Sequence, residues 1–367
     1  MINMIWQEYR VQARLNFKPE AIESIYSIIS EIDGVKNTWH ITDRLLPQTI
    51  ERLTRSVIVT STGSSNRIEG NRLTDIEVEN LYKNLGVKKF KTRDEQEIVG
   101  YLQCLELVFS NYNDVPISES SILKLHHDML IHSHKDIRHR GNYKFGTNRV
   151  EAKDQAGNIV GIIFKPTPPY LVKKEMLELI DWYNWAITNK IKHPLILIAN
   201  FVFEYLAIHP FQDGNGRTSR LLTNLMLLQQ GYYFTQVASH ERSIEASKID
   251  YYLALNKTQS TWKTNSEDIT PWLMFFLNIV KSQSNQALKI IEGDNIEYLL
   301  SEKQLELWNW INNKAIVEFS RKDAVTALGF PERTVESIIK KLVDLKRLSR
   351  LGQGKATRYK LIKKLNN

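Results

Sequence analysis

The sequence has 367 residues, more than one compact core comfortably holds, so its length predicts two or three units. Its single cysteine excludes an intrachain disulfide, and no apolar run approaches the roughly 20 residues that a membrane-spanning helix needs. The first eight residues lack the cationic stretch and apolar core of a secretion signal. We therefore expect a soluble, cytoplasmic protein without a membrane partner.

The first 90 residues have the pattern of helices. Within them, Ser65 and Glu69 are four positions apart and stand directly before Gly70. In a helix this spacing places both side chains on one face, and a glycine commonly ends a helix. Taken alone, the pattern also fits an ordinary surface helix.

Residues 148–164 predict a β-hairpin. Two extended runs, 148–153 and 159–164, flank a polar turn at 154–158 that contains a glycine. Such an edge can pair with an extended segment of another protein through main-chain hydrogen bonds. It can equally serve as a structural cover over the core.

The stretch from His209 to Arg220 lies between two apolar helical patterns, at 194–208 and 218–230. It therefore predicts a loop between two buried helices. The N-terminus of the second helix attracts anions, because its first N–H groups are unpaired and the helix dipole is positive there. Gly214 and Gly216 would let the backbone approach a phosphate without a Cβ in the way.

Three kinds of side chain in this loop suit a nucleoside triphosphate. Arg217 and Arg220 share a helix face, and guanidinium groups bind phosphate oxygens in pairs. Asp213 offers hard oxygen ligands for Mg²⁺ shared with the phosphates. His209 is the group whose ordinary pKa lies nearest neutrality.

The pattern His-x-Phe-x-Asp-Gly-Asn-Gly-Arg-x-x-Arg resembles the signature of Fic-domain enzymes, which transfer AMP from ATP to protein hydroxyls, and all eight specified positions match. The resemblance implies a mainly α fold with a helical core and a hairpin flap. It also implies that His209 deprotonates a Ser, Thr or Tyr hydroxyl of a target protein, and that Asp213 holds Mg²⁺. The remaining implied roles concern ATP: Gly214, Asn215 and Gly216 would cradle its phosphates, and Arg217 and Arg220 would hold the β- and γ-phosphates.

The resemblance extends to two further segments. Ser65 and Glu69 match the inhibitory motif of the family, which implies that Glu69 pairs with Arg220 within one chain and blocks the γ-phosphate. Tyr252 lies in a segment whose tyrosines line the adenine pocket in the family, although tyrosines on helices are more often core residues. Related Doc-type proteins, which phosphorylate, replace both glycines of the loop, so Gly214 and Gly216 favour AMP transfer.

The C-terminal segment carries the basic excess of the chain. Residues 321–367 hold thirteen Lys and Arg against four Asp and Glu, whereas the formal charge of the whole chain is +8. Two helical patterns, 322–328 and 332–345, precede a basic hairpin at 348–361, and the order resembles a winged helix-turn-helix. Such a unit could bind DNA, with Lys355 and Arg358 on phosphates, or dock a protein.

These patterns divide the chain into four segments: an N-terminal helical region (1–90), a Fic core (91–285), a linker (286–300) and a winged-helix domain (301–367). Two other functions stay open, namely removal of AMP with Glu69 orienting a water, and a DNA-bound regulator whose core senses nucleotide. Five histidines between His126 and His139 are expected to be solvated or locally paired, because no clean zinc-ligand spacing is present. The sequence does not determine the oligomeric state, and a homodimer is one of the states that it allows.

Overall fold

The computed structural model of the chain describes residues 9–37, 39, 47–85, 90–148, 150–153, 159–291, 300–314, 316–345, 347–352 and 357–362. The predicted hairpin turn at 154–158, residues 292–299 of the predicted linker, and Lys355 lie outside the described residues. The fold is mainly helical, as the sequence predicts. Among the described residues, no helix combines the length and apolar character needed to cross a bilayer.

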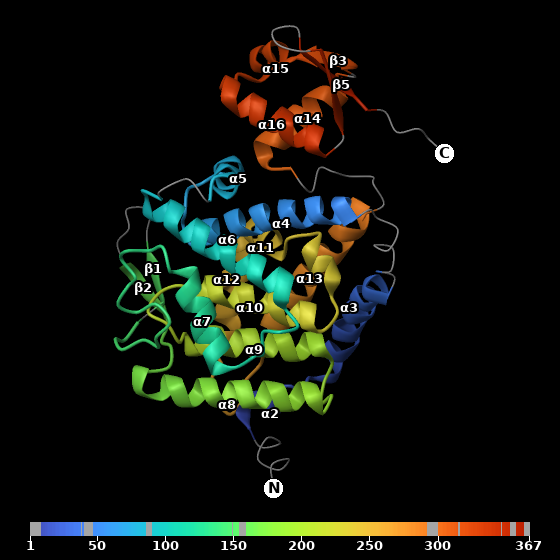
Figure 1. Cartoon of the computed structure of the whole chain (residues 1–367). Coiled ribbons are helices and arrows are strands. Elements are labelled where there is room, and N and C mark those ends of the chain that lie inside the picture. The colour runs from blue at the N-terminus through green and yellow to red at the C-terminus, as the bar shows by residue number, and fades with distance from the viewer. Residues whose placement is uncertain are drawn as a thin grey trace.

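Among the described residues, six helices precede the hairpin, and Figure 1 shows their arrangement. They are α2 (Arg10–Ala13), α3 (Pro19–Asn37), α4 (Pro47–Ile68), α5 (Asp75–Lys83), α6 (Arg93–Asn111) and α7 (Glu119–Met129). Thr74 and Thr92 start α5 and α6 with reciprocal capping boxes, each closed by a glutamate three residues later. Local sequence therefore sets where these two helices begin.

The hairpin consists of β1 (Val150–Lys153) and β2 (Ile159–Phe164), which pair antiparallel. The helices that follow are α8 (Pro169–Thr188), α9 (Pro194–Ile208), α10 (Asn215–Gln229), α11 (His240–Ala246), α12 (Lys248–Gln259) and α13 (Thr270–Ile291), with the short 3₁₀ helix η2 (Tyr233–Gln236) after α10. The predicted helix over 194–208 has these same bounds. The next helix begins at Asn215 instead of Thr218, because Gly214 takes a left-handed conformation and starts it earlier.

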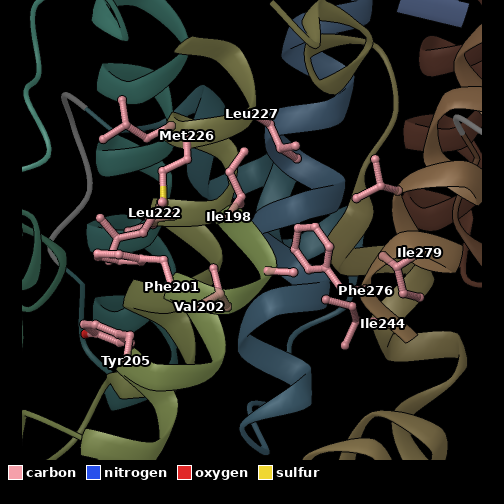
Figure 2. Close-up of a cluster of buried hydrophobic side chains, with 14 of the residues drawn as sticks. Ile198, Phe201, Val202, Tyr205, Leu222, Met226, Leu227, Ile244, Phe276 and Ile279 are labelled. Atoms are coloured by element: carbon pink, nitrogen blue, oxygen red, sulfur yellow. The ribbon is translucent and has the colours of Figure 1, made fainter. Parts of the chain in front are cut away.

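The central helix is α9, whose residues from Leu195 to Ile208 are all buried. A helix that is apolar on every side belongs in the middle of a helical bundle. It packs against α8, α10 and α13, and Figure 2 shows side chains from α9, α10, α11 and α13 meeting in one cluster. The loop between α9 and α10 is thereby fixed at both ends by buried helices.

A buried ionic network attaches α2 to this bundle. Arg14, which follows α2, donates to Glu204 on α9 over 2.6 Å and to the side-chain oxygen of Asn200 over 2.6 Å. Arg10 also pairs with Glu204, and both arginines contact Glu267. Because Arg14 and Glu204 are almost fully buried, each charge depends on the other for compensation.

The C-terminal part has a hydrophobic cluster of its own, to which Ile76 of α5 also belongs. It consists of α14 (Glu302–Asn313), β3 (Glu318–Ser320), α15 (Arg321–Leu328), α16 (Glu332–Asp344), β4 (Leu348–Leu351) and β5 (Arg358–Leu361). The strands form an antiparallel sheet in the order β3-β5-β4. In Figure 1 this part lies beyond α4 and α5, apart from the hairpin.

Candidate active site

The loop from His209 to Gly214 is held by its own backbone and by Asn215. The side-chain oxygen of Asn215 accepts from the Phe211 N–H, and its amide nitrogen donates to the Phe211 carbonyl, both over 2.8 Å. This fixes the shape of the loop and leaves the contact with an anion to the first N–H groups of α10. At Gly214, φ is 81°, and a Cβ there would lie 2.8 Å from the Met129 methyl carbon, so glycine is required.

His126 supports this loop from α7, and its ring stacks on Phe211 with centroids 3.6 Å apart and an interplanar angle of 1°. Its Nδ1 accepts from the Gly141 N–H over 2.9 Å, so we assign the proton to Nε2, which then donates to the Asp213 carbonyl over 2.9 Å. Burial lowers the pKa of His126 to about 4, which keeps this neutral tautomer at physiological pH.

His126 is thus buried within the protein, whereas the sequence analysis expected it to be solvated or locally paired. The sequence pattern that could have predicted this burial is the apolar face of α7, because His126 shares it with Ile122, Leu125 and Met129.

His209 follows α9 in a left-handed conformation, with φ at 54°. Burial and the nearby charge of Lys144 lower its pKa to about 4, so the imidazole is neutral at pH 7 rather than poised near the working pH as expected. Its Nδ1 lies 3.4 Å from the Leu206 carbonyl oxygen. This favours hydrogen on Nδ1 and leaves Nε2 free to accept a proton.

Lys144 is a second neighbour of the loop that the sequence analysis did not assign to the site. Its Nζ donates to the Asn148 side chain over 2.8 Å and to the Ile208 carbonyl over 3.2 Å. Burial lowers the pKa of Lys144 to about 8. The lysine thus places a partly desolvated positive charge beside His209.

Asp213 and Arg217 belong to a cluster of alternating charges. The Asp213 carboxylate contacts Arg93 at 3.1 Å and Arg217 at 3.4 Å, and Arg217 also lies 3.1 Å from Glu97. Burial would raise the pKa of Asp213, but Arg217, the Gly214 N–H and Arg93 hold it below its usual value. The side chain is ionised and 41% exposed, which is the state that a divalent cation requires.

Arg220 is buried and is held by Ser65 and Glu69. Its Nε donates to the Ser65 hydroxyl over 2.8 Å, and one Nη donates to the Ser65 carbonyl over 2.9 Å and to Glu69 over 2.7 Å. Ser65 lies in α4, and Glu69 lies in the turn that follows it. The structure therefore brings together the three residues that the sequence analysis linked, although Arg220 is more than 150 positions from Ser65 and from Glu69.

The same carboxylate lies against the start of α10. A Cβ at Gly216 would be 2.2 Å from a Glu69 oxygen, so only glycine permits this approach. Glu69 therefore lies at the N-terminus of α10, where the helix dipole and Arg220 attract negative charge. A phosphate group at that position would need the space that the carboxylate fills.

Tyr252 lies on α12, and its side chain is 43% exposed. Burial of the hydroxyl and the charge of Glu69 raise the pKa of Tyr252 to about 12. Its ring packs edge-on against Tyr251, with centroids 5.1 Å apart. Tyr251 is buried, and the charge of Arg220 acts on its hydroxyl. Tyr251, which the sequence analysis did not select, therefore lies deeper in the site than Tyr252.

The model of the Fic/DOC family matches residues 116–227, which include α7, the hairpin and the loop between α9 and α10. The chain contains a Fic domain. The protein adenylyltransferase Fic of Nematostella vectensis is 28% identical over 216 residues, which is 58% of this chain and 44% of that protein. The protein of the same name from Drosophila willistoni is 30% identical over 57% of this chain and 37% of its own length. The chain thus spans less than half the length of these two curated relatives.

Solved structures show the same fold. A Fic family protein from Desulfovibrio desulfuricans has a TM-score of 0.60 at 23% identity and aligns with 96% of this chain and 98% of its own. Residues 134–508 of Fic-1 from C. elegans have a TM-score of 0.60 at 18% identity, with 77% of each chain covered. The first likeness extends over nearly the whole chain and is not restricted to the Fic domain.

Proposed function

We propose that this chain is a self-inhibited protein adenylyltransferase that transfers AMP from ATP to a Ser, Thr or Tyr hydroxyl of a target protein. The contact of Glu69 with both Arg220 and Gly216 carries the proposal, because a carboxylate there competes with a phosphate for the same charge and space. The family match and the relatives named adenylyltransferase support AMP as the group transferred.

In the proposed reaction, the hydroxyl oxygen attacks the α-phosphorus of ATP, and its proton passes to Nε2 of His209. The bond between the α-phosphorus and the bridging oxygen breaks, and pyrophosphate leaves. The imidazole of His209 is neutral at pH 7, since its pKa is lowered to about 4, so Nε2 has a free lone pair for the proton, although the lowered pKa makes it a weaker base than an ordinary histidine. Arg217, Arg220 and the first N–H groups of α10 would stabilise the charge of the phosphates.

Mg²⁺ fits this site because Asp213 is ionised, partly exposed and adjacent to the phosphate-binding helix terminus. Asp213 would hold the ion, which would neutralise phosphate charge when bound. Glu97 and Asp136 have carboxylate oxygens within 4.8 Å of those of Asp213, but their side chains are only 9% and 3% exposed, whereas that of Asp213 is 41% exposed. We therefore assign the ion to Asp213.

Labelling from α-³²P-ATP with Mg²⁺ tests the proposal, scored on the enzyme and on a cell lysate. Glu69→Gly should raise labelling at least tenfold over the wild type, because it frees Arg220 and the space beside Gly216. Adding His209→Ala should abolish that gain. Equal labelling by the wild type and Glu69→Gly would contradict self-inhibition, and no labelling by any variant would contradict the transfer itself.

A matched pair of serines sharpens this test. Ser65→Ala removes the hydroxyl that accepts from Arg220, whereas Ser64→Ala removes a neighbouring hydroxyl that accepts from Arg67. Both serines are buried in α4, so the two substitutions disturb packing to a similar degree. Ser65→Ala should partly raise labelling, and Ser64→Ala should leave it at the wild-type level.

Removal of AMP from a modified target is a second proposal. The Glu69 side chain is 35% exposed although it contacts Arg220, so it can also orient a water molecule. In that case, Glu69→Gly would lose removal while gaining transfer. Release of AMP from a protein labelled by the Glu69→Gly variant, followed with the wild-type enzyme, distinguishes the two directions.

A further inference from the structure

The two oxygens of the Asp213 carboxylate have different partners within the chain. Oδ1 accepts from the Gly214 N–H over 2.6 Å and lies 3.4 Å from Nη2 of Arg217. Oδ2 lies 3.1 Å from Nη2 of Arg93. Because Oδ1 is engaged by its neighbours on α10, a divalent cation would bind at Oδ2, where the guanidinium of Arg93 now lies.

Arg93 is placed there by the start of α6. Thr92 caps this helix in a capping box with Glu95, and Nε of Arg93 donates to Glu97 over 2.6 Å. The Arg93 side chain is 47% exposed, whereas that of Glu97 is 9% exposed. The guanidinium can therefore move from Asp213 towards solvent while Glu97, on its buried side, still compensates its charge.

A second arginine at this position differs from Arg93 in its burial. Arg93 and Arg217 both contact Glu97 as well as Asp213. The Arg217 side chain is 2% exposed, so its charge is a fixed part of the site. Of these two arginines, Arg93 is the one that a cation from solvent can displace.

We propose that Arg93 is an intramolecular competitor of the divalent cation at Asp213 and weakens metal binding to the nucleotide-free protein. Mg²⁺ binds a carboxylate oxygen directly at about 2.1 Å. With Nη2 of Arg93 3.1 Å from the same oxygen, the two cations would lie at most about 5 Å apart and would repel. The competition rests on the proposed function, which assigns the ion to Asp213.

Hydrogen bonds join Arg93 to the segment that carries Glu69. The side-chain amide of Asn71 donates to the Asp94 carbonyl over 3.1 Å, and the Arg72 N–H donates to the Asp94 carboxylate over 3.2 Å. The chain just after Glu69 is thus attached to the residue just after Arg93. The same part of the chain therefore supplies a carboxylate at the phosphate position and a guanidinium at the metal position.

Titration of the nucleotide-free full chain with Mn²⁺, followed by the EPR signal of the free ion, tests the proposal. Arg93→Gln should bind Mn²⁺ about fivefold more tightly than the wild type, a gain in keeping with the small contribution of an exposed ion pair. The matched control is Lys91→Gln, which removes an exposed charge two positions away and should bind like the wild type. Equal affinities of the two variants, or weaker binding by Arg93→Gln, would overturn the proposal.

Asp213→Asn shows whether the ion binds at Asp213. Added to Arg93→Gln, it should abolish the gain in Mn²⁺ affinity, and a gain that persists would overturn the proposal. If Asp213→Asn alone leaves Mn²⁺ binding unchanged, the assignment of the ion to Asp213 is wrong, and the competition is wrong with it. If Asp213→Asn weakens binding but Arg93→Gln has no effect, only the competition is wrong. Neither measurement depends on AMP transfer.

Discussion

Burial and a neighbouring lysine together set the protonation state of His209. Its pKa of about 4 reflects loss of water around the imidazole and, next, repulsion by Lys144. Lys144→Met removes that repulsion, so the pKa of His209 should rise toward its ordinary value of about 6.5. Titration of ¹³C-labelled histidine by NMR in the nucleotide-free protein measures the change.

The matched substitution for this test is Lys165→Met, which removes an exposed lysine outside the loop. It should leave the His209 titration unchanged. A His209 signal that titrates near 6.5 in the wild type would contradict the role of burial. Equal effects of the two substitutions would contradict the role of Lys144.

Single residues also show where prediction from sequence succeeds. The roles of His209, Asp213 and Arg220 stay predictions, but the sequence placed these residues in one short stretch, from the loop into α10, because they are close along the chain. His126 and Lys144 were not assigned to the site, because nothing in their local pattern shows that α7 and the segment before β1 pack on that loop. Only the three-dimensional structure shows that these residues belong to the site: the His126 side chain hydrogen-bonds to the carbonyl oxygen of Asp213, which is 87 positions away.

At the scale of elements, the buried contact between Arg14 and Glu204 attaches α2 to α9, and substitutions measure how much it contributes to stability. Arg14→Met should lower the free energy of unfolding by about 3 kcal/mol, because it leaves a buried charge on Glu204 with less compensation. Arg10→Met should cost less, since the Arg10 side chain is 28% exposed. Urea denaturation measures both values.

Adding Glu204→Gln to Arg14→Met should recover part of the loss, because the unpaired charge is then absent. No recovery would mean that Arg14 contributes through packing instead of charge. Contacts of this kind cannot be predicted from periodicity, since Arg14 and Glu204 are 190 positions apart. Helix bounds can be predicted far better: the expected helices at 322–328 and 332–345 differ from α15 and α16 by one residue at one end.

At the scale of the whole molecule, buried histidines make stability depend on pH. Burial lowers the pKa of His126 and of His209 to about 4, and that of His240 also falls. Between about pH 6.5 and 4 the unfolded chain binds protons that the folded chain does not, so stability falls as the pH falls. His126 and His209 should each contribute a loss on the order of 3 kcal/mol across this window.

Urea denaturation at pH 7 and pH 5 should therefore give a lower free energy of unfolding at pH 5. His126→Gln should reduce this difference, because the substituted side chain does not titrate. His134→Gln, at an exposed histidine, should leave it unchanged. A free energy that is constant between pH 7 and pH 5 would contradict the lowered pKa values, since the ordinary carboxylates titrate below this range.

Because Glu69 and Arg220 belong to the same chain, dilution cannot separate them. The effective concentration of the carboxylate at the guanidinium is set by the fold and is the same at every expression level. A ligand that binds Arg220 must therefore displace the Glu69 carboxylate of the same chain, and the protein concentration does not change this competition. Control of this contact therefore acts either through such a ligand or through the geometry of α4 and α10, which position the two residues.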